Sequence, residues 1–184
     1  MNPRSSCILL LFACLANVAT GQVPDEAEVA MKTETLANLP RYVEWPDGAF
    51  VIPSTPLMLG VYGHSEIHRR LIATSDGKTV NGRRVMVRRY RWPQVPNCHV
   101  LFIARSERRR LPWIMKKVQY STTLTVSEFD DFLTHGGILR LSMKDDKVRF
   151  HVNTGTARDV GLRFSSQFLS VADQVVGEPG SAPR

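Results

Sequence analysis

The clearest pair of metal-ligand types in this chain is His64 and His68, four residues apart. On one face of a helix, this spacing would bring both imidazoles within reach of one metal ion. The order is His-Ser-Glu-Ile-His, not the His-Glu-x-x-His of zinc peptidases, and His64 precedes Ser65, the expected helix cap. We therefore interpret both as exposed histidines at a helix end, and predict neither a metal nor a cofactor.

Serines and carboxylates that could support catalysis lack the arrangement that catalysis needs. Ser65, Ser106 and Ser127 each follow an apolar run, but none lies in a Gly-x-Ser-x-Gly elbow, and each is placed to cap a helix. The pairs Asp130-Asp131 and Asp145-Asp146 are adjacent in sequence, which fits turns and helix surfaces better than convergence on one substrate. We predict no catalytic residue and no enzyme.

Binding is better supported. The side chains that we expect to contact a ligand are two aromatic residues after the first helix and three basic residues near the C-terminus: Tyr42, Trp45, Arg149, His151 and Arg163. The alternative is that the aromatic rings pack in the core and the basic groups are solvated. In a parallel sheet, helix N-termini also gather at the carboxyl ends of the strands, where their amides attract anions, so a ligand crevice could form at that edge.

A unit of apolar strand followed by Ser-Glu recurs three times, and it predicts how these residues are positioned. The expected strands are 57–63, 100–103 and 124–126, and the expected helices are 65–74, 106–120 and a short one at 128–134. Strands that alternate with helices imply crossover connections and a mostly parallel sheet.

The other elements complete an α/β domain. We expect a first helix from 26 to 39 that Pro40 ends, an edge-type strand at 84–91 with one wet face, a hairpin from strands 138–143 and 147–152, and a helical stretch 154–176 bent at Gly161. The predicted architecture is a single three-layer α/β/α domain with a mostly parallel sheet and a C-terminal β-hairpin plus helices. It spans residues 26–176, before a disordered tail at 177–184.

The first 21 residues read as a cleavable signal peptide. Arg4 supplies a positive charge, residues 8–16 form an apolar run too short to span a bilayer, and Ala19-Thr20-Gly21 is a small-residue cleavage site. Lipidation at Cys14 and an uncleaved anchor stay open as alternatives. We expect export to the bacterial periplasm.

Export changes the meaning of the cysteines. Cys7 and Cys14 leave with the signal, so Cys98 is alone in the mature chain and no disulfide can form within it. Cys98 begins the apolar run 98–103, which favours a buried, inert thiol over one exposed for an intermolecular bond.

Composition and charge set broad limits. Apolar residues at 43% and charged residues at 22% are typical of a globular protein. The formal net charge of +7 invites comparison with nucleic-acid binding, but the arginines are spread along the chain and the compartment is wrong. We expect solvated basic faces with a secondary attraction to anionic envelope polymers, and no nucleic-acid partner.

Several motifs in order resemble one known family. The segment 97–107, Asn-Cys-His-Val-Leu-Phe-Ile-Ala-Arg-Ser-Glu, resembles a "CHILFIxxSE" signature, and 124–127 with Gly136-Gly137-Ile138 resembles "LTVSD…GG-I". Further matches lie at 60–63, 147–153 and 157–169. Together they cover nearly all of the mature chain, which resembles the YfiR-like periplasmic proteins.

The resemblance implies a regulator. The best-known member represses a membrane-bound diguanylate cyclase from the periplasmic side, and an OmpA-like outer-membrane lipoprotein sequesters it. This implies that the chain contacts the periplasmic domain of an inner-membrane signalling protein and lowers cyclic-di-GMP. Such a regulatory module predicts an apolar partner-binding patch, a homodimer and no turnover. The alternative is a periplasmic small-ligand sensor for another receptor or signalling system.

One position departs from the family. Some members bridge the cysteine of the Cys-His motif to a cysteine in the first strand, and here the likely position in that strand is Gly60. Redox control through such a bridge is therefore doubtful in this protein.

Overall fold

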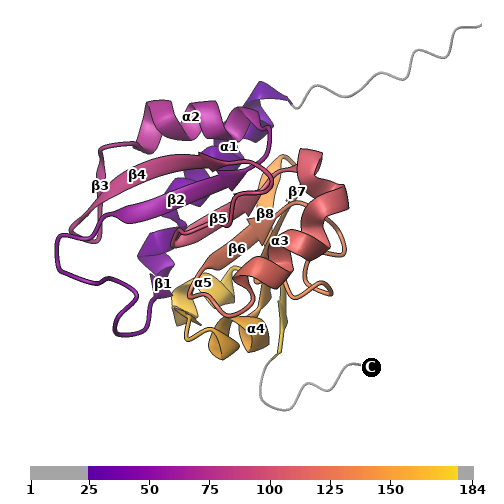
Figure 1. Cartoon of the computed structure of the whole chain (residues 1–184). Coiled ribbons are helices and arrows are strands. Elements are labelled where there is room, and N and C mark those ends of the chain that lie inside the picture. The colour runs from indigo at the N-terminus through magenta and orange to yellow at the C-terminus, as the bar shows by residue number, and fades with distance from the viewer. Residues whose placement is uncertain (1–24, 178–184) are drawn as a thin grey trace, which may run out of the picture.

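The computed structural model describes residues 25–177, which form an eight-stranded sheet with helices on both faces and a separate two-stranded pair (Figure 1). The expected signal peptide and the tail from 178 onward lie outside the described residues. The α-helices are α1 (Glu26–Asn38), α2 (Glu66–Ser75), α3 (Leu111–Val118), α4 (Thr154–Asp159) and α5 (Ser166–Ser170). Two 3-10 helices, η1 (Leu39–Tyr42) and η2 (Arg105–Arg110), precede β1 and α3.

The main sheet has the order β10-β8-β7-β6-β5-β2-β4-β3. Its strands are β2 (Leu57–Tyr62), β3 (Thr79–Val80), β4 (Arg83–Tyr90), β5 (Val100–Ile103), β6 (Leu124–Ser127), β7 (Leu139–Lys144), β8 (Lys147–Asn153) and β10 (Gln174–Val176). Only the β3–β4 and β7–β8 pairs are antiparallel, which confirms the predicted mostly parallel α/β domain with its hairpin. Strands β1 (Val43–Glu44) and β9 (Arg163–Phe164) form a separate antiparallel pair.

The core has two parts because the central strands are buried on both faces. Helices α1 and α2 cover one face, where Leu36 and Leu71 pack on Leu59 and Val126. Helix α3 covers the other face together with the segment after β6, and the aromatic ring of Phe132 is fully buried there. These two layers explain why β5 reads as an unbroken apolar run and why all four residues of β6 are buried, its threonine and serine included.

The recurring Ser-Glu unit behaves as predicted only once. Ser65 caps α2 by accepting a hydrogen bond from the Ile67 N–H. Ser106 instead contacts the backbone of His64, and Ser127 donates to the Ile103 carbonyl from within β6. The helix expected at 106–120 therefore begins as a 3-10 helix, and α3 starts only at Leu111, where Pro112 fits the first turn.

Two further helix predictions are wrong. Residues 128–134 form no helix, and turns cover 130–136, because the preceding serine is used inside the strand and leaves the first turn uncapped. The stretch 154–176 is two short helices separated by β9 and followed by β10, since Gly161 has a φ of 79° that ends α4 and lets the chain reverse onto β1. The hairpin is confirmed, with Asp145 and Asp146 both at positive φ in its two-residue turn.

Candidate functional site

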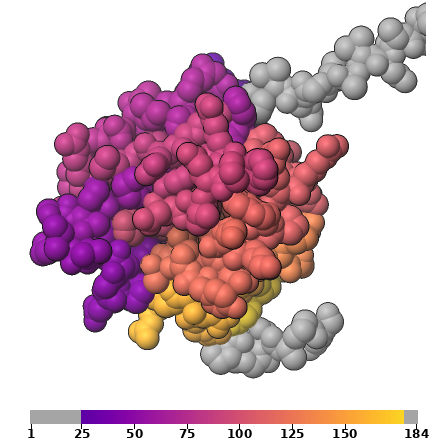
Figure 2. Space-filling view, viewed as in Figure 1, coloured from indigo at the N-terminus to yellow at the C-terminus, as the bar shows by residue number. Residues whose placement is uncertain are grey.

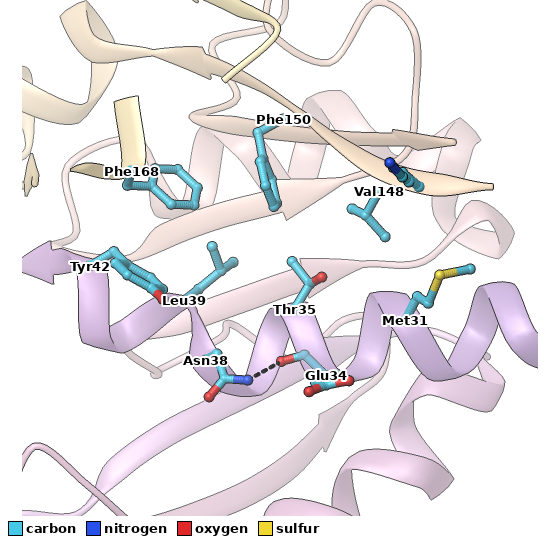
Figure 3. A pocket seen from close by; sticks show the side chains of 10 residues that line it. Met31, Glu34, Thr35, Asn38, Leu39, Tyr42, Val148, Phe150 and Phe168 are labelled. Atoms are coloured by element: carbon cyan, nitrogen blue, oxygen red, sulfur yellow. Dashed lines mark hydrogen bonds between the residues drawn. The ribbon is translucent and has the colours of Figure 1, made fainter. Parts of the chain in front are cut away.

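An open groove with a mostly apolar lining lies between α1, strand β8 and helix α5 (Figure 3). It has a volume of about 380 Å³. Its lining comes from α1, η1, β8 and α5: Met31, Glu34, Thr35, Asn38, Leu39, Tyr42, Lys147, Val148, Phe150 and Phe168. We call these residues the α1–β8 groove.

The spacing of residues along the chain builds this groove. On α1, Met31, Thr35 and Leu39 recur every four residues and so lie along one side of the helix. On β8, Val148 and Phe150 are two residues apart and point to the same face of the sheet. The two rows face each other across the groove, as Figure 3 shows.

Aromatic rings close one end of the groove. The Phe168 ring lies 5.0 Å from Phe150, 5.3 Å from Phe164 and 5.6 Å from Tyr42, measured between ring centroids. Phe168 and Leu39 are buried and form the floor, whereas Met31, Val148, Phe150 and Tyr42 are only half-buried. The exposed parts of these half-buried side chains form an apolar surface on which a partner could pack.

Apart from the hydroxyls of Thr35 and Tyr42, the polar side chains of the lining lie at the rim of the groove. Glu34 and Lys147 are exposed, and the Asn38 side-chain amide donates to the Glu34 backbone carbonyl at 3.1 Å (Figure 3). The lining contains no histidine, cysteine or serine and no pair of carboxylates. This arrangement can bind an apolar surface with polar groups at its margin, and it offers no proton-transfer pair for catalysis.

Of the residues predicted to bind, Tyr42 is the one that lies in the α1–β8 groove. The sequence indicated its aromatic surface but not its neighbours on β8. Those neighbours are more than 100 positions further along the chain, and the pairing of α1 with β8 is a tertiary contact.

Trp45 lies elsewhere, in a cluster around His99 of the Cys-His motif. Its ring centroid is 6.0 Å from Phe50 and 6.3 Å from His99, and its Nε1–H donates to the Thr122 carbonyl at 3.2 Å. Phe50 stacks on His99 at 4.3 Å, with Arg83 above its other side. Trp45 is thus half-buried and packs against the core in this cluster.

His99 has a structural role that the sequence did not reveal. Its Nδ1 accepts a hydrogen bond from the Met58 N–H at 3.0 Å, which leaves Nε2 to donate to the Ala49 carbonyl at 3.2 Å. The imidazole therefore ties β2 to the loop before it in the neutral form. Burial lowers the pKa of His99, and the positive charge of Arg83 lowers it further.

Arg149 and His151 lie on the opposite face of β8 from Val148 and Phe150, because alternate residues of a strand point to opposite faces. Arg149 pairs with Asp173 at 3.5 Å and lies 3.8 Å from Asp145. His151 contacts Ser142 and Arg140, both at 2.9 Å. Burial lowers the pKa of His151, and Arg140 adds to this effect. The sheet itself separates these two residues from Tyr42.

Arg163 is exposed on β9, opposite Glu44 of β1. It borders a shallow hollow of about 480 Å³ that Trp45 and Arg158 also line. The five predicted residues are thus distributed over the groove, the His99 cluster, the far face of β8 and the β1–β9 pair, and they do not form one site.

The crevice expected at the carboxyl ends of the strands is present and has a volume of about 390 Å³. A buried ion network crosses it, in which the Lys32 ammonium contacts the carboxylates of Glu28 and Glu128. Arg105 also binds Glu128, with Nε and carboxylate oxygen 3.1 Å apart. Sequence reasoning missed Lys32, whose acidic partner Glu128 is far away in the chain. The charges in this crevice already neutralise one another. The crevice is therefore a less suitable anion site than we expected from its helix N-termini alone.

Cys98 is buried, and burial raises the pKa of its thiol to about 12. A Cβ atom added to Gly60 would lie only 2.6 Å from the Cys98 Sγ. The structure therefore places Gly60 opposite Cys98, where the family comparison had placed it.

Other features bear on the expected class of protein. Within residues 25–177, no group of histidine, cysteine and acidic side chains could hold a metal ion. No helix in that part of the chain is long and apolar enough to cross a membrane. His64 is exposed and lies before α2, outside the helix that carries His68.

Comparison with known proteins follows the motifs. No curated protein matches the chain. A family model described as YfiR/HmsC-like matches residues 29–173, from the first turns of α1 to the residue before β10. The matched region includes the Cys-His motif on β5, the β7–β8 hairpin and every residue of the α1–β8 groove. The chain therefore belongs to the YfiR/HmsC-like family.

Proposed function

We propose that this protein is a periplasmic regulator that represses a membrane-bound diguanylate cyclase by direct contact and so lowers intracellular cyclic-di-GMP. The observation that carries the proposal is the family match over residues 29–173, since regulation of a cyclase is the role that the family suggests. The partner is the periplasmic domain of the cyclase, and an OmpA-like lipoprotein would compete for the regulator.

The α1–β8 groove is the contact surface in this proposal. Its half-buried apolar side chains can bury further surface on a partner, at about 25 cal/mol for each Å² removed from water. The buried floor of Leu39 and Phe168 keeps the lining in place before a partner arrives. Little conformational entropy is therefore lost on binding.

The test measures cyclic-di-GMP in the native host. We expect a rise when the gene is deleted and a return to normal when the exported protein is restored, but no return with a form lacking residues 1–21. Met31→Glu and Val148→Glu place a charge on the groove rim, so neither variant should restore repression. Tyr120→Glu is the matched control, because Tyr120 is 91% exposed after α3 and far from the groove.

Immunoblots of periplasmic extracts show whether each variant is exported and stable. No change in cyclic-di-GMP on deletion, under conditions where the protein is made, would contradict repression of a cyclase. Full activity of both groove variants at normal protein level would instead contradict the groove as the contact surface.

The size of the groove favours a second candidate function, which is sensing of a small ligand. Its volume of about 380 Å³ falls within the range of about 300–1,000 Å³ that is typical of small-molecule sites. The ligand would be apolar or aromatic with one polar end near Glu34 or Lys147. Thermal-shift screening of the purified protein against amphiphilic aromatic compounds tests this, with Val148→Glu as the variant that should lose any stabilisation.

A further inference from the structure

The outer edge of β4 is largely unpaired. β4 is the second strand from one end of the sheet, and its outer neighbour β3 pairs only with Arg83 and Arg84. On its inner side β4 is aligned with β2 along its whole length from Val85 to Tyr90. No other strand of residues 25–177 covers the outer side beyond Arg84.

Hydrogen bonds show which backbone groups face outward. The Val85 N–H donates to Lys78 at 2.7 Å and the Val87 N–H donates to the Asp76 carboxylate at 2.8 Å, both on the outer side. The Tyr90 carbonyl accepts from Gly63 on the inner side. Because the direction alternates along a strand, the Val87 carbonyl and both backbone groups of Arg89 point outward.

These outward groups have no hydrogen-bond partner among the described residues. We call the segment from Val87 to Arg91 the β4 edge. It lies at the end of the sheet opposite the groove, since β2, β5, β6 and β7 separate β4 from β8. A partner at this edge would therefore leave the groove free.

Positive charge without a partner is concentrated at the β4 edge. Arg88 and Arg91 at this edge, and Arg84 near the start of β4, are exposed and form no ion pair with the described acidic residues. The Nη2 atom of Arg89 is buried without any hydrogen bond, while its Nε donates to the Gly63 carbonyl. The Asp76 carboxylate, on the outer side of β4, already accepts a hydrogen bond from the Val87 N–H.

Most arginines on the α2, η2 and β7 elements differ in this respect, with Arg109 as the exception. Six of these seven arginines have acidic partners: Arg69, Arg70, Arg105, Arg108, Arg110 and Arg140. Apolar side chains also flank the β4 edge, with Met86 44% exposed and Trp92 56% exposed. In the space-filling view, the magenta chain that contains β4 lies at the surface beside α3 (Figure 2).

We propose that the β4 edge accepts an extended acidic segment of a partner protein as an additional strand. The unpaired backbone groups supply main-chain hydrogen bonds, and the arginines select carboxylates on the segment, since Arg88 lies on one face of the sheet and Arg89 and Arg91 lie on the other. A second copy of this chain is disfavoured, because antiparallel pairing of two β4 edges would bring arginines against arginines. A lipid surface would use the charge but not the backbone groups.

The first experiment uses the purified mature protein and a fluorescent nine-residue peptide of alternating glutamate and valine. We expect saturable binding by fluorescence anisotropy, weakening as salt increases. We also expect the Arg89 amide to gain protection from hydrogen exchange. Peptides with lysine in place of glutamate, or with N-methyl groups at alternate amides, should not bind.

The variant for this test is Arg88→Glu with Arg91→Glu, which should weaken peptide binding about tenfold or more. Arg109→Glu with Lys116→Glu is the control, because both residues are exposed on η2 and α3 and the net charge changes equally. Neither pair lies in the α1–β8 groove, so repression of cyclic-di-GMP by the groove can be scored separately.

Three results would overturn the proposal. Equal binding of the N-methylated peptide would show that charge alone attracts the segment. Equal loss of affinity in the control variant would show a diffuse electrostatic effect. Binding to phosphatidylglycerol vesicles that requires Arg88 and Arg91, without binding of the peptide, would assign the edge to a membrane surface instead.

Discussion

Replacing Gly60 with cysteine should restore a disulfide to this fold. A Cβ at position 60 would lie 2.6 Å from the Cys98 Sγ. In a disulfide, each Cβ lies about 3 Å from the sulfur of the other cysteine, because the S–S bond is about 2.04 Å long. A shift of a few tenths of an ångström therefore suffices to form the bond.

The magnitude follows from the loop that the bond would close. A loop of about 40 residues predicts about 4 kcal/mol of stabilisation through the lower entropy of the unfolded chain. The new Cβ would also lie 2.9 Å from the Tyr90 ring, in the oxidised and in the reduced variant alike. We expect this overpacking to destabilise each form by about 2 kcal/mol, so that it cancels when the two forms are compared.

The assay is urea unfolding of Gly60→Cys with and without reductant, after refolding in a glutathione redox buffer. This step matters because a thiol whose pKa is raised to about 12 is slow to react once buried. The free energy of unfolding should be about 4 kcal/mol higher for the oxidised form than for the reduced form. Gly60→Ala is the control for overpacking, and it should not respond to reductant.

Thiol titration of the unfolded protein decides whether the bond formed. Two free thiols per chain after oxidative refolding, with no difference between oxidising and reducing conditions, would refute the assignment of Gly60 as the partner position of Cys98.

Three further predictions concern stability. Lys32→Met should lower the free energy of unfolding by about 3 kcal/mol, because it leaves the 11%-exposed Glu128 without the buried ammonium. The control Arg69→Met breaks an exposed pair and should lower it by less than about 1 kcal/mol. Equal urea midpoints for the two variants would contradict the buried role of Lys32. Phe168→Ala should cost about 3–5 kcal/mol by calorimetry, since it removes the ring on which the groove floor is built. The lowered pKa of His99 means that the unfolded state takes up its proton first, so stability should fall as pH drops below about 6.5. The fall should be shallower in His99→Asn than in His151→Asn, and identical pH profiles would exclude His99 as the main cause.

The sequence was sufficient for the six longer strands, β2 and β4 to β8, and for the class of fold, but not for the short strands β1, β3, β9 and β10. An apolar run such as Val100–Ile103 indicates a strand even before its neighbours in the sheet are known. Ser65 with Glu66 marks a helix start through local capping. The burial of Cys98 also followed from its own apolar neighbours. Such features are local, so composition and spacing over a few residues determine them.

The Ser-Glu motif was misleading at two of its three positions, because tertiary contacts there bind the serine hydroxyl that would otherwise cap a helix. Ser106 and Ser127 carry the same Ser-Glu signal as Ser65, yet they bond to His64 and Ile103 of neighbouring elements. Nothing in the sequence near 106 or 127 indicates this competition for the hydroxyl group.

The candidate site depended on tertiary structure for a similar reason. Tyr42 carried a signal because an aromatic residue after a helix is visible in the sequence. Its groove partners on β8, the ion pair of Lys32 with Glu128 and the unpaired side of Arg89 depend on strand order and on which face each residue occupies. The sequence therefore determined the longer strands and helices α1 and α2, and only the packing of the elements decided which side chains and backbone groups remained available for a partner.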